Sequence, residues 1–443
     1  MQKKTDASFE RLVAEAIEHH NAGRLAEAEG CYNAALEIFP RHAAILHNLG
    51  VLLASQNNHP AAIERFDASI AAEPRYASAH YNRAVAMDAL GHVDDAIQGF
   101  SRTVVLEPGH YASHRALGFL RLAKGDRGRS LDHFARTYEL RRGEDRADIA
   151  SSSLTSATRS KLLHDAEQFG YLSRHARSAQ RFAVLASNYE RIGRPFPDTM
   201  TKLTDADFEI VGDDYNTAIH VAAAPEVPDG AVHRRSDADE IMRRFDEGDA
   251  GVVFFDDLLT PRALSALKRY LLESTIWHDF AHIGGFVASY LEDGLACPLV
   301  LQIADELRAA FPDVLGPHPL SQIWAFKGFE RHSKVDVHAD DGAVSVNFWV
   351  TPTEANLEPG RGGLVVCRAR PPSDWVMKDY DADQAPILEF LKQNSADSTV
   401  VPYRENRAVL FESRLFHYSD APMFADGYEN HRINVTMLFG KTT

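Results

Sequence analysis

Three segments, AEGCYNAALEIFP at 28–40, AIERFDASIAAEP at 62–74 and AIQGFSRTVVLEP at 96–108, follow one another with a period of 34 residues. Each begins with alanine, carries an aromatic residue at its fifth position and ends in proline. Such a period is typical of a helix–turn–helix unit that cannot bury its apolar face alone and therefore stacks on its neighbours. The front third of the chain is thus predicted to be a stack of helical hairpins.

The period extends on both sides of these segments. The small residues of the first helices recur as Ala16, Gly50, Ala84 and Gly118, and a fourth unit carries Ser130 and Phe134 and ends at Arg142 without a proline. These motifs resemble the tetratricopeptide repeat over about residues 8–142. The resemblance implies an all-α superhelix with a concave groove that binds a peptide segment or a partner protein.

Two other roles for the repeats stay open. They could serve only to make the protein a homodimer, or to brace the rest of the chain. Asn48, Asn82 and Arg83 lie on the predicted first helices of repeats two and three, where they either line the groove or form a solvated face.

Length and composition divide the chain further. Its 443 residues suffice for two to three domains, and a polar, serine-rich junction begins at residue 143. We expect a repeat domain at 1–142, a helical and irregular linker region at 143–249 and a third domain at 250–443.

Charge and cysteine content exclude several classes of protein. The net charge of −16 disfavours binding to nucleic acid or to anionic lipid. Cys31, Cys297 and Cys367 lie far apart, which excludes a disulfide framework and a thiolate zinc site. The N-terminal segment is charged and amphipathic, and no stretch approaches the roughly 20 apolar residues of a membrane helix. We expect a cytoplasmic protein.

From about residue 320 the apolar pattern changes from helical to alternating. The segments IWAFKGFE, AVSVNFWVTP, GGLVVCRAR, NRAVLFES and RINVTMLFG are typical of short strands with turns between them. They predict a β-sandwich or barrel.

A metal site is indicated by His338 and Asp340, directly before one of these strands, and by His417 on another. In extended backbone, residues two apart point to the same face, so this imidazole and carboxylate can reach one ion. Two histidines and a carboxylate leave adjacent positions open, as non-haem Fe(II) oxygenases require. Asp341 is an alternative ligand, but alternation turns it to the opposite face.

An anion site is indicated on the last predicted strand. Arg432 and Asn434 share one face there, and a guanidinium buried in a barrel needs an anionic partner such as a carboxylate. Asn347, on the strand after the H-x-D motif, either hydrogen-bonds a bound molecule or is an inward amide satisfied by backbone. His431 precedes Arg432 and points away from it, so we expect it at the surface.

H-x-D, a later His and R-x-N resemble the double-stranded β-helix family of Fe(II)- and 2-oxoglutarate-dependent dioxygenases, especially the prolyl-hydroxylase-like group, over roughly residues 250–443. The resemblance implies an α+β domain with a jelly-roll core, in which the iron ligands are His338, Asp340 and His417. It further implies that Arg432 holds the C5 carboxylate of 2-oxoglutarate, assisted by Asn434. Fe(II), 2-oxoglutarate and dioxygen then hydroxylate a C–H bond, and a need for ascorbate is left open.

The substrate stays open at this point. A protein or peptide recruited by the repeats is the first hypothesis, and a small or carrier-bound metabolite is the second. A non-catalytic repeat scaffold with a metal-binding barrel, or a zinc hydrolase that uses the same ligands, is the third. The segment 371–399 is expected to be an insertion that covers the mouth of the site.

Overall fold

The computed structural model describes residues 2–143, 154–247, 251–281, 285–328, 335–372, 375, 384–394 and 397–441. The chain divides into two compact units, Met1–Arg136 and Thr137–Thr443. The segment 143–249, expected to be a separate linker region, belongs to the second unit together with the strands.

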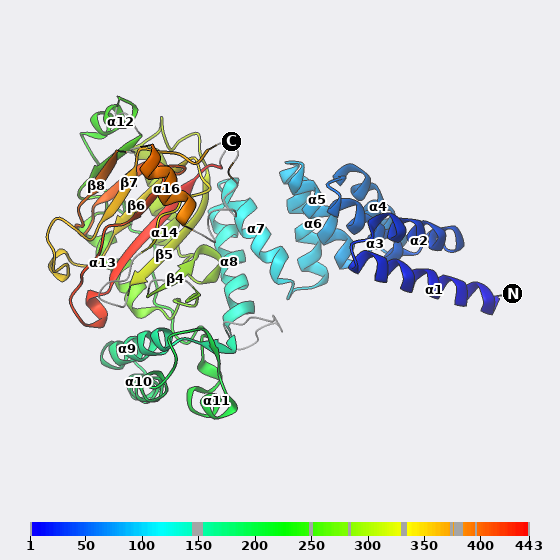
Figure 1. Ribbon diagram of the computed structural model, residues 1–443, viewed down its shortest axis with the longest axis horizontal. Helices are drawn as coiled ribbons and strands as arrows, with labels where there is room; N and C mark the ends of the chain where they lie inside the picture. Colours follow the sequence, from blue (N-terminus) through cyan, green and yellow to red (C-terminus); the bar gives the residue numbers. More distant parts are fainter. Residues whose placement is uncertain are drawn as a thin grey trace. The chain divides into compact units, whose positions relative to one another are not determined.

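The first unit is built from helices that pack in successive pairs (Figure 1). The chain forms α1 (Gln2–Asn21), α2 (Leu25–Ile38), α3 (Ala43–Ser55), α4 (His59–Ala72), α5 (Ala77–Ala89), α6 (Val93–Leu106), α7 (Tyr111–Ala123) and α8 (Arg127–Arg142), and the boundary between the units falls within α8. The predicted stack of four helical hairpins is therefore confirmed.

The packing inside each hairpin explains the 34-residue period. A small residue on the first helix lies against the aromatic residue found 16 positions later, and all of them are buried: Ala16 with Tyr32, Gly50 with Phe66, Ala84 with Phe100, and Gly118 with Phe134. A Cβ added to Gly50 would lie 2.6 Å from the Phe66 ring, and one added to Gly118 would lie 2.6 Å from the Phe134 ring. The aromatic ring thus requires the small residue opposite it.

The turn inside each hairpin repeats with the same period. Gly23, Asn57, Gly91 and Gly125 all have positive φ, between 61° and 76°. Glycine adopts this left-handed conformation without steric cost, and asparagine tolerates it better than most residues. The prolines at 40, 74 and 108 each stand two residues beyond a helix end, where they cannot disturb the helix.

The second unit begins with a helical group. It holds α9 (Arg159–His175), α10 (Ala179–Gly193), α11 (Asp205–Val211) and the short helix η2 (Gly212–Asp214), gathered beneath the strands in the view of Figure 1. Phe169 and Tyr189 meet edge to face at 4.9 Å in the buried cluster between α9 and α10.

Further helices accompany the strands. They are α12 (Ala238–Glu247), α13 (Pro261–Glu273), α14 (Pro298–Ala310) and α16 (Ala385–Gln393), with the short helices η3 (Leu291–Asp293), η4 (Thr353–Ala355) and η5 (Tyr428–Asn430). The helix α13 starts at Pro261, and its N-cap Thr260 accepts a hydrogen bond from the Ala263 N–H. None of the helices in the described ranges is long and apolar enough to cross a membrane.

All of the strands pair antiparallel. They are β1 (Ser156–Ala157), β2 (Thr201–Lys202), β3 (Val252–Phe255), β4 (Phe286–Tyr290), β5 (Leu320–Gly328), β6 (Val344–Trp349), β7 (Leu364–Cys367), β8 (Ser398–Val401), β9 (Ala408–Glu412), β10 (His417–Ser419) and β11 (Arg432–Phe439). A six-stranded sheet has the order β3-β9-β6-β11-β5-β4, a three-stranded sheet has the order β10-β7-β8, and β1 pairs with β2.

The two larger sheets share one apolar cluster. Trp349 and Phe411 reach it from the six-stranded sheet, and Leu364, Val366 and Val401 reach it from the three-stranded sheet. The region is therefore β-rich and its sheets face each other across a common core. Part of the predicted insertion at 371–399 (residues 373–374, 376–383 and 395–396) lies outside the described residues, and its described part includes α16.

Candidate metal centre

A short antiparallel bridge brings His338 and His417 together. The His338 N–H donates to the His417 carbonyl at 3.0 Å, and the His417 N–H donates to the His338 carbonyl at 2.8 Å. The two rings consequently lie side by side, with centroids 4.2 Å apart. Val337 and Ala339, the neighbours of His338, pack into an apolar cluster instead. Alternation along this extended segment therefore turns His338 and Asp340 toward the same side.

The three predicted ligand residues converge on one point. His338 Nε2 lies 3.5 Å from Asp340 Oδ1, and His417 Nε2 lies 3.5 Å from Asp340 Oδ2. All three ligand atoms lie within 4.8 Å of one another. An ion bound at about 2.1 Å by each atom would hold neighbouring ligand atoms about 3 Å apart, so only small side-chain movements are needed.

Backbone carbonyls orient both imidazoles. His338 Nδ1 lies 2.9 Å from the Asp336 carbonyl, and His417 Nδ1 lies 2.8 Å from the Leu415 carbonyl. Because a carbonyl only accepts, each Nδ1 carries the proton and each Nε2 turns its lone pair toward Asp340.

The electrostatics favour a neutral His417 imidazole and an ionised Asp340 carboxylate. Burial lowers the pKa of His417 to about 4, and the neighbouring His338 acts in the same direction. Burial alone would raise the pKa of Asp340, but His417, His338 and the hydrogen bond from Ser345 together lower it. Near neutral pH, His417 and Asp340 are therefore in the protonation state that binds a metal ion.

Ser345 orients the carboxylate, and sequence reasoning did not single it out for this role. Its hydroxyl lies 3.0 Å from Asp340 Oδ2 and 2.9 Å from the Ser413 Oγ. The signal was available, because Ser345 shares a face of β6 with Asn347. Asp341, the alternative ligand, is exposed and does not belong to the His338–Asp340–His417 cluster.

Arg432 is buried in the same cavity. Its Nε donates to the Gly362 carbonyl at 2.9 Å, its Nη2 to the Gly363 carbonyl at 3.1 Å and its Nη1 to Asn434 Oδ1 at 3.2 Å. Nη1 and Nη2 each carry two N–H donors and Nε carries one, so one donor on each Nη is left after these bonds. Burial lowers the pKa of Arg432 to about 10, which still leaves the guanidinium charged near neutral pH.

The two asparagines have different roles. The Asn434 side chain orients Arg432 by accepting its hydrogen bond. Asn347 is 6 % exposed, and its buried Oδ1 has no hydrogen-bond partner within the described ranges. Since buried polar atoms are normally satisfied, the Asn347 side-chain amide is a candidate for a contact with water or with a bound molecule.

All six predicted site residues line a single narrow cavity of about 20 Å³. The other residues of its wall are Trp324, Phe326, Val335, Leu364, Tyr418, Ser419 and Thr436. The cavity thus joins three potential metal ligands, a charged guanidinium and an unsatisfied amide oxygen within an otherwise largely aromatic and aliphatic wall.

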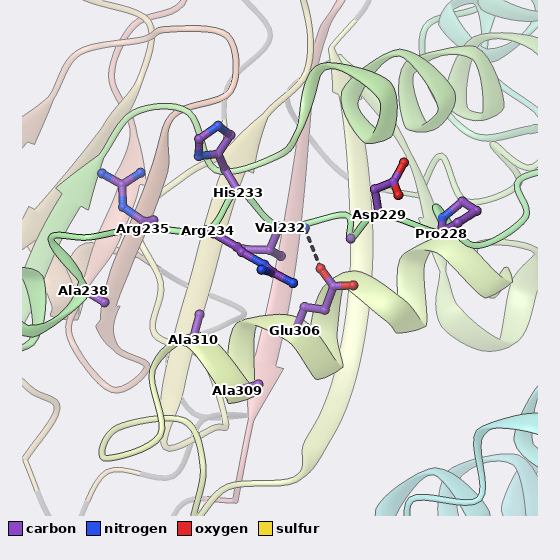
Figure 2. A pocket seen from close by; sticks show the side chains of 11 residues that line it. Pro228, Asp229, Val232, His233, Arg234, Arg235, Ala238, Glu306, Ala309 and Ala310 are labelled. Carbon is purple, nitrogen blue, oxygen red and sulfur yellow. Dashed lines mark hydrogen bonds between the residues drawn. The ribbon is translucent and has the colours of Figure 1, made fainter.

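A wider hollow of about 960 Å³ lies elsewhere, between the segment around His233 and α14 (Figure 2). Two carboxylates line it, Asp229 and Glu306, and Glu306 accepts hydrogen bonds from the backbone N–H groups of Ala231 and Val232, both at 2.7 Å. This carboxylate therefore braces the loop, and the hollow lacks a set of converging ligands like that of the smaller cavity.

The prediction that His431 lies at the surface is wrong. His431 is 6 % exposed, and its Nε2 lies 3.1 Å from the carboxylate of Glu167 on α9. It does point away from Arg432, but Tyr428 and α9 cover that face of the strand.

The polar residues considered for the groove of the repeats bond within the first unit. Asn82 Nδ2 lies 2.8 Å from His47 Nε2, and Asn48 Oδ1 lies 3.0 Å from His47 Nδ1. Arg83 donates to Asp67 at 2.6 Å. These side chains therefore link neighbouring helices and repeats.

Comparison with known proteins bears on the first unit. Two family models described as tetratricopeptide repeats match residues 14–73 and 54–111. The chain contains tetratricopeptide repeats. Proteins with such repeats commonly bind other proteins. The matches do not identify a particular partner. No curated protein matches the chain.

Solved structures resemble the repeat part. MamA from Desulfovibrio magneticus is 27 % identical over 31 % of this chain and 77 % of that one, with a TM-score of 0.29. The first tetratricopeptide-repeat domain of Spaghetti (RPAP3), bound to an HSP90 peptide, is 19 % identical over 27 % of this chain and 94 % of that one, with a TM-score of 0.26. An O-GlcNAc transferase from Thermobaculum terrenum is 26 % identical over 31 % of this chain and 28 % of that one, with a TM-score of 0.28. TM-scores this low do not bear on function.

Proposed function

We propose that the second unit is an Fe(II)- and 2-oxoglutarate-dependent dioxygenase with a double-stranded β-helix core, which hydroxylates a C–H bond. The observation that carries the proposal is one cavity that holds two imidazoles, a carboxylate and a buried guanidinium, whose two Nη atoms each have one N–H left after the bonds described above. Each of these groups has a separate use in that chemistry.

The donor set fits Fe(II). His338, Asp340 and His417 supply two nitrogens and an oxygen, which is the facial set of non-haem iron oxygenases. Structural zinc sites use four protein ligands, and the group found among the described residues has three. The remaining coordination positions are then available to a co-substrate and dioxygen.

The anion site fits the distal carboxylate of 2-oxoglutarate. The free donors of Arg432, one on each Nη, suit a two-oxygen acceptor. The carbonyls of Gly362 and Gly363 hold the other side of the guanidinium, so its direction is set before a ligand binds. Because 2-oxoglutarate offers only acceptors, Asn347 would contact it through its Nδ2 donor, with the amide turned accordingly.

With iron bound, the site supplies the activation of dioxygen: R–H, 2-oxoglutarate and O2 become R–OH, succinate and CO2. The chain's own residues prepare this reaction. His338 and His417 would present their Nε2 atoms to the ion, Ser345 would hold the Asp340 carboxylate, and Arg432 would bind the co-substrate. The aromatic side chains of the cavity wall limit the access of water.

We further propose that the substrate is a protein or peptide recruited by the tetratricopeptide repeats. The match of residues 14–111 to repeat models supports a protein-binding role for the first unit. A small or carrier-bound metabolite is the second candidate, and a homodimer and a requirement for ascorbate remain part of the hypothesis. Three free cysteines favour the reducing cytoplasm.

Anaerobic addition of Fe(II) and 2-oxoglutarate to the full chain tests the proposal. We expect a visible metal-to-ligand charge-transfer band that His338→Ala abolishes and Arg432→Ala weakens. His233→Ala, at an exposed histidine of the same unit, serves as the matched control and keeps the band. Absence of a band at saturating ligand would contradict the proposal, and tight Zn²⁺ binding without 2-oxoglutarate binding would favour a non-oxidative metal barrel.

A further inference from the structure

One buried hydroxyl holds the backbone on both sides of Arg432. Thr351 Oγ1 donates to the His431 carbonyl at 2.7 Å and accepts the Ile433 N–H at 2.9 Å. Thr351 is 2 % exposed, so water does not replace these bonds readily. The hydroxyl thus links the peptide groups that precede and follow Arg432.

The hydroxyl takes the place of a backbone bond at the end of the sheet. The pairing of β6 with β11 ends at Trp349 opposite Asn434. Beyond it, the Val350 N–H still reaches the Ile433 carbonyl at 3.2 Å, but the Ile433 N–H bonds to the Thr351 side chain. Pro352 follows and has no N–H for the next bond, so the side chain completes the pairing where the main chain cannot.

Thr351 is itself anchored. The Tyr403 hydroxyl donates to the Thr351 carbonyl at 2.6 Å, and Tyr403 is 4 % exposed. The Tyr403 ring lies 5.6 Å from the Trp349 ring, and Trp349 in turn lies 5.8 Å from the Arg432 guanidinium. The backbone of Arg432 is therefore tied to the buried apolar cluster that contains Trp349 and Tyr403.

We propose that Thr351 is a positioning residue for Arg432, and that it sets the affinity of the site for the distal carboxylate of a dicarboxylate ligand. This inference rests on the proposed function. Gly362, Gly363 and Asn434 fix the guanidinium end of the side chain, and Thr351 fixes the backbone end. A change at either end moves the two free N–H donors away from the carboxylate, and a planar, two-point contact tolerates little displacement.

The test compares two keto acids on the intact chain with Fe(II) under anaerobic conditions. 2-Oxoglutarate has the distal carboxylate and 2-oxobutyrate lacks it, while both chelate a metal through the same keto-acid end. We expect Thr351→Val to raise the Kd of 2-oxoglutarate about tenfold and to leave the Kd values of 2-oxobutyrate and Fe(II) unchanged. Thr351→Ser, which keeps the hydroxyl, should bind 2-oxoglutarate like the wild type.

Three outcomes overturn the inference. Unchanged 2-oxoglutarate binding by Thr351→Val shows that the hydroxyl does not position Arg432. Equal losses for both keto acids show a general structural role. If the wild type binds Fe(II) but neither keto acid, the proposed function fails and the inference with it.

Tyr403→Phe covers the case in which Thr351→Val does not fold. It removes only the bond to the Thr351 carbonyl, and we expect it to weaken 2-oxoglutarate binding about threefold and to spare 2-oxobutyrate. An unchanged Kd for 2-oxoglutarate in this variant would count against the anchoring of Thr351.

Discussion

Lowering the pH should destabilise the second unit through His164, a buried histidine of α9. His164 is 1 % exposed and its Nδ1 lies 3.0 Å from Asp165 Oδ1. Burial lowers its pKa from 6.5 to about 3, and the charges of Lys327 and Lys161 act in the same direction, against the hydrogen bond to Asp165. The folded state therefore keeps this imidazole neutral.

The sign and size follow from linkage. Between pH 6.5 and about 3 the unfolded chain binds this proton and the folded chain does not. The contribution to stability is thus present above pH 6.5 and is lost as the pH falls toward the folded-state pKa. With these two values, the free energy of unfolding falls by about 2.5 kcal/mol between about pH 7 and about pH 4.5.

Urea unfolding followed by tryptophan fluorescence measures this change in the second unit. All four tryptophans lie there: Trp277, Trp324, Trp349 and Trp375. His164→Asn should cost about 1 kcal/mol at pH 7, through the lost bond to Asp165. Between pH 7 and pH 4.5, the free energy of unfolding of this variant should fall by about 2.5 kcal/mol less than that of the wild type. His233→Asn, at an exposed histidine, is the control and should behave like the wild type.

Equal acid-induced losses in the wild type and His164→Asn would refute this reasoning. Burial also lowers the pKa of His278 and of His431. A residual loss common to every variant is therefore expected, and only the difference between variants reports His164.

Three further predictions concern the site and the repeats. Arg432→Met removes two charge-assisted hydrogen bonds and should therefore weaken 2-oxoglutarate binding by about 3 kcal/mol or more. A charge-transfer titration should show this loss and an unchanged affinity for 2-oxobutyrate. A loss of 2-oxoglutarate affinity below about tenfold would contradict the role of Arg432 in binding the carboxylate. Ser345→Ala should weaken Fe(II) or Co²⁺ binding about 10- to 100-fold in a metal titration, because Ser345 orients the Asp340 carboxylate. The control Ser321→Ala, on β5, should bind the metal like the wild type. If Ser345→Ala also binds the metal like the wild type, Ser345 does not support the metal site. Phe66→Ala should cost about 3 to 5 kcal/mol in circular-dichroism melting. Gly50→Ala should lower the free energy of unfolding far more in the wild type than in the Phe66→Ala variant. If the effects of the two substitutions simply add, the contact between Gly50 and the Phe66 ring is contradicted.

Local patterns predicted much of the fold. The 34-residue period predicted the helical hairpins, because each repeat buries its apolar face against the next and therefore selects the same residue types at the same positions. Alternation predicted strands that include β5, β6 and β11, because the side-chain period of a strand is two. The left-handed turn positions Gly23, Asn57, Gly91 and Gly125 carried the same period, so the sequence contained this signal as well.

The candidate site depended both on the local spacing of residues in the sequence and on the tertiary structure. The sequence by itself determined that His338 and Asp340 share one face, since they stand two residues apart in an extended segment. Only the tertiary structure decided that His417, some eighty positions later, meets them through a backbone bridge. It also decided that Asn434 orients Arg432 while Asn347 keeps an unsatisfied oxygen, and that α9 covers His431. These outcomes depend on which distant backbone lies opposite each side chain, and spacing along one chain does not contain that information.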